Sequence, residues 1–180
     1  FGTLDGRLIA LDQKTGAKAW ETKLVDTAKT SGSNFTSPPT VAGDVLIIGP
    51  TGGDLVQRGH IFGLNAITGE KVWEFETLKD DRASWPKEAI EHGGGGAWLA
   101  GQYDPDTGLY YIGTSNAAPD FNGADRAGDN LYTATLLANG VSPADVLRIN
   151  RVGTTMDTLR VTSKPIEAAL RGDTGTVQAT

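Results

Sequence analysis

A segment that occurs twice restricts the possible fold more than any other feature of this chain. Residues 6–16 lead to Trp20, and residues 59–69 lead to Trp73. The two copies lie 53 residues apart and correspond at five spaced positions: Gly6 and Gly59, Asp12 and Asn65, Thr15 and Thr68, Gly16 and Gly69, and Trp20 and Trp73. A third, degenerate copy at residues 103–108 lacks the tryptophan. A repeat of this period indicates a fold built from one recurring supersecondary unit.

Each copy of the repeat is predicted to form a β-hairpin. Alternating apolar residues, such as Leu64 and Ala66, are typical of one face of a strand. The following Asx-x-x-Thr-Gly segment predicts the turn, because an Asp or Asn side chain accepts hydrogen bonds from nearby backbone N–H groups and glycine accepts a positive φ. Trp20 and Trp73 then lie on the returning strands. We expect each indole to pack against the neighbouring unit.

Further strands are predicted at residues 41–49 and 109–113. Short strands with a period of about 50 residues are typical of β-propellers whose blades have four strands. The chain has 180 residues, enough for about three such blades, whereas a closed propeller needs about 4–8. We therefore predict an all-β fold, a β-propeller fragment with two open sheet edges that carry an aggregation risk.

The repeat pattern divides the chain after residue 133. Residues 1–133 carry the predicted blades, and residues 134–180 are predicted to be a divergent continuation of the same propeller. That continuation is expected to be partly helical, because Ser142-Pro143 matches an N-cap serine followed by a proline at the first helical position. Genuine divergence and a reading-frame error would both produce this departure, and the nucleotide sequence would separate them. The sequence opens at Phe1 without a signal-peptide pattern, so we expect a piece of a longer protein.

Composition excludes several classes of function. The net charge is −6 and no block of Lys and Arg is present, which argues against nucleic acid as a partner. No window of the sequence approaches the roughly 18 apolar residues of a membrane span. Cysteine is absent, so this chain forms no internal disulfide and no thiolate metal site.

The Asp-x-x-Thr-Gly-x-x-x-Trp repeat, with the strand before it, resembles the tryptophan-docking motif of quinoprotein alcohol and methanol dehydrogenases, which depend on pyrroloquinoline quinone (PQQ). The resemblance covers residues 1–133 and is weak over residues 134–180. It implies about three blades of an eight-bladed propeller. It also implies a periplasmic enzyme that oxidises a small alcohol to an aldehyde with PQQ and a metal ion, and that passes electrons to a cytochrome c or to quinone.

The same resemblance implies a set of cofactor-binding residues. Trp98 follows the glycine run 93–96 and would stack its indole on PQQ, while the glycines would let the backbone approach the flat ligand closely. Thr51-Gly52-Gly53 would hold PQQ through hydroxyl and backbone groups, and Thr36 would bond one of its carboxylates. The family usually has a Thr where this chain has Gly96.

Three oxygen-bearing side chains are implied as metal ligands: Asp54, Asn116 and Asp157. Asp54 replaces a Glu of the family, and Asn116 follows Trp98 by 18 residues; carboxylate and amide oxygens both suit a hard cation. Asp157 is also the implied catalytic base, 41 residues after Asn116, although both of its neighbours differ from the family's Trp-Asp-Tyr triplet. Lanthanide-using relatives have a second Asp where this chain has Leu159, which favours calcium.

Three hypotheses therefore stay open. The first is a PQQ-dependent alcohol dehydrogenase, which the spacing of Asp54, Trp98 and Asn116 favours. The second is a non-catalytic periplasmic propeller scaffold with the same repeats and no cofactor, which the altered Gly96, Asp54 and Met156 favour weakly. The third is a chain that is inactive in isolation, because a cofactor on a propeller axis contacts many blades. The sequence does not specify which alcohol is oxidised, the electron acceptor or the oligomeric state.

Overall fold

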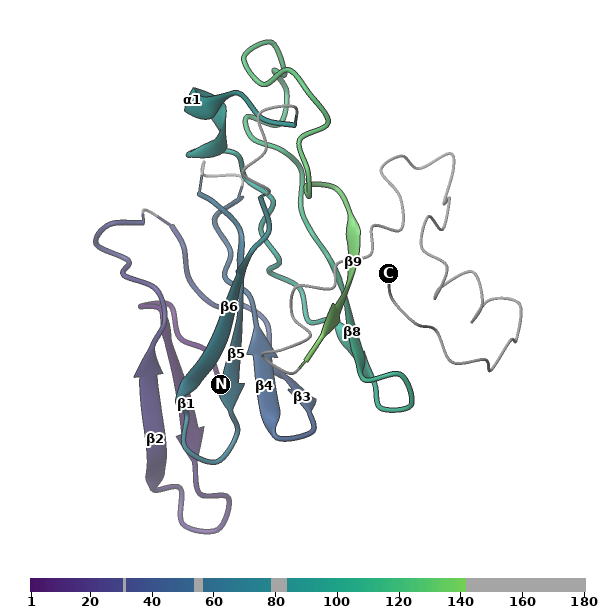
Figure 1. Ribbon diagram of the computed structural model, residues 1–180. Helices are drawn as coiled ribbons and strands as arrows, with labels where there is room; N and C mark the ends of the chain where they lie inside the picture. The colour runs from purple at the N-terminus through teal and green to yellow at the C-terminus, as the bar shows by residue number, and fades with distance from the viewer. Residues whose placement is uncertain (31, 54–56, 79–83, 142–180) are drawn as a thin grey trace.

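The computed structural model describes residues 1–30, 32–53, 57–78 and 84–141. Within these ranges the regular secondary structure is almost entirely β-strand, as predicted, and the strands form three antiparallel sheets (Figure 1). The strands are β1 (Arg7–Leu11), β2 (Lys18–Lys23), β3 (Thr40–Ala42), β4 (Val45–Ile48), β5 (His60–Asn65), β6 (Lys71–Glu76), β7 (Gln102–Asp104), β8 (Leu109–Gly113) and β9 (Leu136–Gly140). The helix α1 is a single turn, Lys87–Ile90, and no described helix is long and apolar enough to cross a membrane.

The middle sheet has the order β3-β4-β5-β6 and is a complete four-stranded blade. The sheet before it pairs β1 with β2, and the sheet after it has the order β7-β8-β9. Each sheet therefore runs in simple sequence order, as expected of propeller blades. The predicted helix beginning at Ser142 lies outside the described residues.

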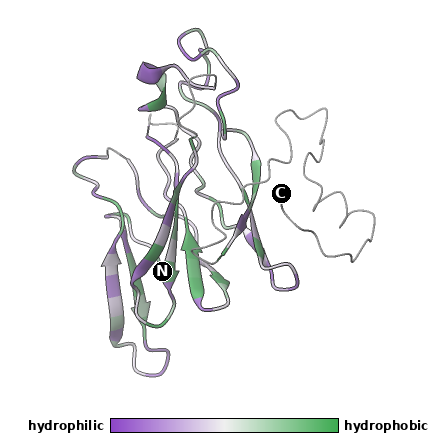
Figure 2. Ribbon diagram, in the orientation of Figure 1, coloured by the Kyte–Doolittle hydropathy of each residue, from purple (hydrophilic) through white to green (hydrophobic). Residues whose placement is uncertain are grey.

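The blades pack face to face, and the middle sheet is buried on both sides. One apolar cluster joins the first sheet to the middle sheet and includes Leu8 and Phe62. A second cluster joins the middle sheet to the third and includes Ile61 and Tyr110. Because neighbouring residues of β5 point to opposite faces, the burial of both Ile61 and Phe62 requires a blade on each side. Figure 2 shows how the hydropathy differs between sheets: β4 in the buried middle sheet is strongly hydrophobic, whereas β2 in the first sheet is largely hydrophilic.

The two predicted turns have the expected hydrogen bonds. The Asp12 Oδ1 atom accepts the backbone N–H groups of Lys14 at 3.0 Å and Thr15 at 2.8 Å. In the second copy, the corresponding acceptor is Asn65 Oδ1, which binds the N–H groups of residues 67 and 68, both at 2.9 Å. Gly69 closes this turn with a φ of 74°, a conformation that glycine adopts without strain.

Residues 103–108, the degenerate third copy, form the same kind of hydrogen-bonded turn between a different pair of strands. Asp104 Oδ1 accepts the N–H of Asp106 at 2.9 Å, and the Thr107 hydroxyl donates to Oδ2 at 2.8 Å. This turn joins β7 to β8, the first two strands of its sheet, whereas the turn at Asn65 joins the last two strands of the middle sheet. Residues 103–108 are therefore a recurring local turn and not a third copy of the tryptophan-bearing hairpin.

The repeated tryptophans connect neighbouring blades, as expected. Trp20 Nε1 donates to the Ala66 carbonyl of the middle sheet's turn at 3.3 Å. The Trp20 ring lies so close to Gly69 that a Cβ there would meet it at 2.4 Å. Trp73 does the same one blade further on, with Nε1 donating to the Val141 carbonyl at 2.9 Å.

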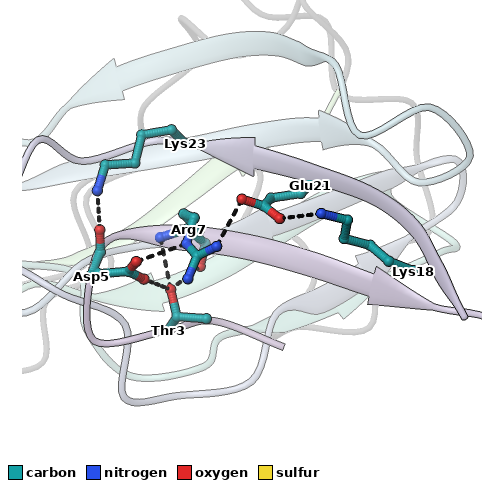
Figure 3. A network of polar contacts seen from close by, with 6 residues as sticks. All are labelled: Thr3, Asp5, Arg7, Lys18, Glu21 and Lys23. Carbon is teal, nitrogen blue, oxygen red and sulfur yellow. Dashed lines mark hydrogen bonds and ion pairs between the residues drawn. The ribbon is translucent and has the colours of Figure 1, made fainter. Parts of the chain in front are cut away.

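Charged side chains cover the exposed side of the first sheet (Figure 3). Arg7 lies 2.8 Å from both Asp5 and Glu21, and Lys18 pairs with Glu21 at 2.7 Å. Hydrogen bonds from Arg7 and, to a smaller extent, Thr3 lower the pKa of Asp5 to about 2. Such exposed pairs add little stability, but charge near an edge strand disfavours pairing with a further chain.

Candidate functional site

The predicted site residues within the described ranges all lie at one end of the blades. Thr36 lies between β2 and β3, Thr51 between β4 and β5, Trp98 between β6 and β7, and Asn116 between β8 and β9. Because the strands are antiparallel, alternate connections lie at the same end of a sheet. The tight turns lie at the opposite end (Figure 1). Asp54 and Asp157, the two carboxylates predicted for the site, lie outside the described residues.

Three of these connections meet, and backbone hydrogen bonds join two of them. Ser115 N–H donates to the Gly96 carbonyl at 2.9 Å, and Gly95 N–H donates to the Asn116 carbonyl at 3.0 Å. A Cβ at Gly53 would lie 2.8 Å from Ser115 Oγ and 3.0 Å from Gly96 N. The segments that precede Asp54, Trp98 and Asn116 are therefore held together, although these residues lie far apart in the sequence.

The glycine run has a packing role within the protein that the sequence did not predict. A Cβ at Gly93 would lie 2.6 Å from Leu78 Cδ1, and one at Gly94 would lie 2.7 Å from the Asn116 carbonyl oxygen. Gly94 also has a φ of 76°, which L side chains rarely adopt. At Gly96 the nearest atom would be 3.5 Å away, an ordinary contact. Gly93 and Gly94 therefore approach the protein's own atoms closely, and among these three glycines Gly96 alone has room for a side chain.

The side chains predicted to contact a ligand are turned outward. Trp98 is 42% exposed, and Asn116 and Thr36 are also exposed. Ala97, immediately before the tryptophan, is completely buried in the cluster between the middle and third sheets. Burial of Ala97 fixes the chain at this point, so that the Trp98 ring is presented at the surface on a supported backbone.

Thr51 is already engaged within the protein. Its N–H donates to the Asn34 carbonyl at 2.7 Å, and its hydroxyl donates to the same oxygen at 3.2 Å and accepts the Asn34 N–H at 3.3 Å. A Cβ at Gly52 would lie 3.1 Å from Ser33 Cα. These contacts tie the connection after β4 to the connection after β2, a structural role that the sequence pattern did not reveal.

A separate apolar cluster supports the loop end of the fold. Trp85 is fully buried with Leu78, Ile90 and Ala117, and its Nε1 donates to the Leu131 carbonyl at 2.6 Å. The Leu131 N–H in turn donates to Ser84 Oγ at 2.6 Å. This cluster joins the connections that carry Trp98 and Asn116. In the sequence, the one indication of this cluster is that Trp85 belongs to neither copy of the repeat.

A cavity of about 280 Å³ lies beside this site, next to Ser33 and Pro50. Its lining is charged, but the charges are largely paired. Arg58 contacts Glu76 and lies 3.7 Å from Glu91, and His60 Nδ1 lies 3.0 Å from Glu74 Oε1. Trp98, Asn116 and Thr36 do not line the cavity.

The donor set of the described residues is compatible with a metal site but incomplete. Among the described residues, no three His, Cys, Asp or Glu side chains gather closely enough to hold an ion. The exposed Asn116 amide supplies one oxygen donor next to the contact of Gly53 with Ser115. Hard cations bind such amide oxygens together with carboxylates, so the arrangement fits a metal that takes its remaining ligands from other segments.

Comparison with known proteins gives one family. Residues 1–142 match the PQQ family model, described as the glucose/ethanol/alcohol dehydrogenase beta-propeller domain. The chain is 35% identical over 158 residues to the quinoprotein alcohol dehydrogenase PedH of Pseudomonas putida, an alignment that covers 77% of this chain and 26% of the relative. It is 34% identical over 155 residues to subunit 1 of the methanol dehydrogenase [cytochrome c] of Methylorubrum extorquens, with 74% of this chain and 24% of the relative covered.

A solved structure agrees with these sequence matches. The europium-containing methanol dehydrogenase superposes with a TM-score of 0.74 at 31% identity, covering 82% of this chain and 29% of that one. The described blades therefore form part of a propeller of this type, which confirms the predicted fold class. The chain spans about a quarter of the length of the two curated relatives, at 26% and 24%.

Proposed function

Because the chain belongs to the family of PQQ-dependent alcohol dehydrogenases with a β-propeller domain, we propose that it supplies part of the cofactor site of an enzyme that oxidises an alcohol to an aldehyde. The observation that carries this proposal is the contact of three connections, two of which carry the exposed side chains Trp98 and Asn116. A planar quinone with a bound metal ion requires an aromatic face and oxygen donors, and these two connections supply one of each.

Each residue has a proposed role toward the cofactor. When bound, PQQ supplies the electron acceptor for the substrate hydride, while a metal ion polarises its carbonyl group. Trp98 offers its exposed ring as a stacking surface, and Thr36 and Thr51-Gly52-Gly53 orient the quinone. Asn116 and Asp54 bind the ion. Asp157 binds it too and takes the hydroxyl proton of the alcohol as general base.

Calcium is the metal we propose, and a lanthanide is the alternative. Leu159 stands where a lanthanide site would need a second carboxylate. The matched methanol dehydrogenase contains europium, which is the reason to retain a lanthanide as the alternative. We further propose a cytochrome c or quinone as electron acceptor, in line with the cytochrome c of the matched methanol dehydrogenase, and a periplasmic location. The isolated 180 residues are expected to show no turnover, because a cofactor on the propeller axis needs the remaining blades.

Binding of PQQ tests the proposal directly. The chain is titrated with PQQ and Ca²⁺ in a calorimeter, together with Trp98→Ala and Trp98→Phe. Removing the indole should weaken PQQ binding about tenfold or more, since stacking on an aromatic face contributes about 1–3 kcal/mol. Phenylalanine keeps an aromatic face and should retain most of the affinity.

A control variant separates loss of the site from loss of the fold. Asn122→Ala changes an exposed residue in the same connection as Asn116 and should bind PQQ like the unaltered chain. PQQ binding that is equally strong in the unaltered chain and in Trp98→Ala would contradict the proposal and leave the non-catalytic scaffold as the better explanation.

A further inference from the structure

The short segment that carries Trp98 is exposed along its length but fixed at both ends. Trp98 is 42% exposed, Leu99 is 54% exposed, and Ala100 is also exposed. Three residues without a buried side chain have no packing of their own that would hold one conformation. The direction of the Trp98 ring therefore depends on the residues at the two ends of the segment, Ala97 and Gly101.

Ala97 holds the first end by close packing. It is completely buried in the cluster between the middle and third sheets. Its carbonyl oxygen lies against Gly49, where a Cβ would meet it at 2.2 Å. Gly49 directly follows β4, so this end of the segment is fixed on the middle sheet.

Gly101 holds the second end by hydrogen bonds to two different sheets. Its N–H donates to the hydroxyl of Tyr110, a residue of β8 in the third sheet, at 2.9 Å. Its carbonyl accepts the hydroxyl of Thr40, a residue of β3 in the middle sheet, at 3.2 Å. A Cβ at Gly101 would lie 2.6 Å from Tyr110 Cζ, so the tyrosine ring packs directly against this backbone. The N–H, the Cα and the carbonyl of Gly101 are therefore each held by one of two side chains.

The Tyr110 hydroxyl serves Gly101 and not the apolar cluster in which its ring lies. The side chain is 1% exposed and packs in the same cluster as Ala97, where a phenylalanine would fill the same space without a polar atom to satisfy. Burial raises the pKa of Tyr110, and hydrogen bonds with Thr40 and with the Gly101 N–H offset only part of this effect. The hydroxyl is therefore neutral at neutral pH and is a permanent acceptor for the Gly101 N–H.

We propose that Tyr110 is a positioning residue that fixes the direction of the Trp98 ring through Gly101. The Thr40 hydroxyl supports the same backbone group from the middle sheet. Tyr110 does not touch the cofactor and acts along the three residues that separate Gly101 from Trp98. A ring that is already held in one direction loses less conformational freedom when a ligand stacks on it. The inference rests on the proposed function, because it takes the Trp98 ring as the surface on which PQQ stacks.

The first test follows the tryptophan ring in the chain without cofactor. The chain contains four tryptophans, and labelling with fluorotryptophan gives each of them a fluorine NMR resonance; the resonance that is missing in Trp98→Phe belongs to Trp98. Tyr110→Phe should shift or broaden this resonance and leave that of Trp85, which lies in a separate cluster, unchanged. Amide hydrogen exchange at Gly101 should become about threefold to tenfold faster, because its N–H loses its acceptor.

Tyr111→Phe is the matched control. Tyr111 is the next residue of β8 and points to the opposite face of the sheet. Loss of its hydroxyl should change neither the Trp98 resonance nor the amide exchange of Gly101. Thr40→Val removes the second hydroxyl with little change in shape and should act in the same direction as Tyr110→Phe, so the test does not depend on the folding of one variant.

Calorimetry with PQQ and Ca²⁺ separates positioning from a general effect on stability. Tyr110→Phe should weaken PQQ binding about threefold or more when Trp98 is present. The same substitution should have no further effect in the Trp98→Ala chain, because the ring that it positions is absent. An equal loss of affinity in both backgrounds would mean that Tyr110 does not act through Trp98 and would overturn the proposal.

The two kinds of measurement distinguish failure of this inference from failure of the proposed function. If neither Tyr110→Phe nor Thr40→Val changes the fluorine signal or the amide exchange, the positioning role is wrong, whatever the affinity for PQQ. If both variants respond as expected but Trp98→Ala binds PQQ as tightly as the unaltered chain, the proposed function is wrong and the positioning of the ring by Tyr110 stands. The fluorine and exchange measurements need no cofactor and decide the positioning role by themselves.

Discussion

Replacing one tryptophan that docks two blades should cost far more stability than replacing the tryptophan of the candidate site. Trp73 is 7% exposed and packs in the cluster between the middle and third sheets. Its ring lies over Gly63, where a Cβ would meet it at 2.1 Å, and its Nε1 donates to the Val141 carbonyl at 2.9 Å. Trp98 is 42% exposed. The same substitution, Trp→Ala, therefore removes a blade-to-blade contact at one position and a surface ring at the other.

The structure gives the expected magnitudes. Truncating a buried Trp to Ala costs about 3–5 kcal/mol, and the Val141 carbonyl also loses its donor, which adds about 1 kcal/mol. Surface substitutions change stability by about 0.5 kcal/mol or less. Domains are stable by only about 5–15 kcal/mol in total. Trp73→Ala should therefore remove a large share of the folding free energy, and Trp98→Ala should remove little of it.

Urea denaturation followed by far-UV circular dichroism measures both variants on one scale, and avoids tryptophan fluorescence, which each substitution changes. With a slope of about 1–3 kcal/mol per molar urea, the midpoint of Trp73→Ala should fall by at least about 1 M, or the variant should be unfolded without urea. The midpoint of Trp98→Ala should stay close to that of the unaltered chain. Equal midpoints for the two variants would refute the assignment of Trp73 to blade docking.

Two further predictions concern stability. Asn139 is buried in β9, and among the described residues neither its amide oxygen nor its amide nitrogen has a hydrogen-bond partner; Asn139→Leu should therefore raise the urea midpoint by the equivalent of about 1–3 kcal/mol, whereas the same change at exposed Asn122 should not. The hydrogen bond from the Thr15 hydroxyl, and to a smaller extent those from two backbone N–H groups, lower the pKa of Asp12. The stability that the ionised Asp12 contributes is complete above the unfolded pKa of about 3.9 and is lost as the pH falls through the lower folded pKa. Asp12→Asn keeps an acceptor, as Asn65 does in the second copy, and thermal midpoints between about pH 2 and pH 6 should depend less on pH than those of the unaltered chain.

The sequence predicted the features whose cause lies within a few residues. The turns at Asp12 and Asn65 formed as expected because the acceptor, the donors and the closing glycine are all within five positions. The docking of Trp20 on the next blade was also predictable, because the repeat itself supplies the partner. The segment at 103–108 shows the limit of this reasoning: the same local turn can occupy a different place in a blade, and only strand pairing decides which.

The candidate site was predictable only in part, because its geometry depends on contacts between connections. Trp98 and Asn116 were identified by resemblance, and the structure presents both at the surface. The reason for the glycines before Trp98 was not predictable, since Leu78 and the Asn116 carbonyl, which exclude a side chain there, are distant in the sequence. Ser115 and Trp85 belong to no motif, and their roles become visible only when three connections are seen together.

This arrangement makes the site depend on the docking of the blades. Each described connection contributes one or a few candidate residues, so no single blade contains a complete site. The relative position of the segments around Trp98 and Asn116 is fixed by several backbone hydrogen bonds between their connections, and the sheets that bear these connections are held together through the cluster that includes Trp73. Because a loop can hold a ligand only on a scaffold that holds the loop, Trp73→Ala should disturb the candidate site although Trp73 lies in the cluster between the sheets and not in the connections.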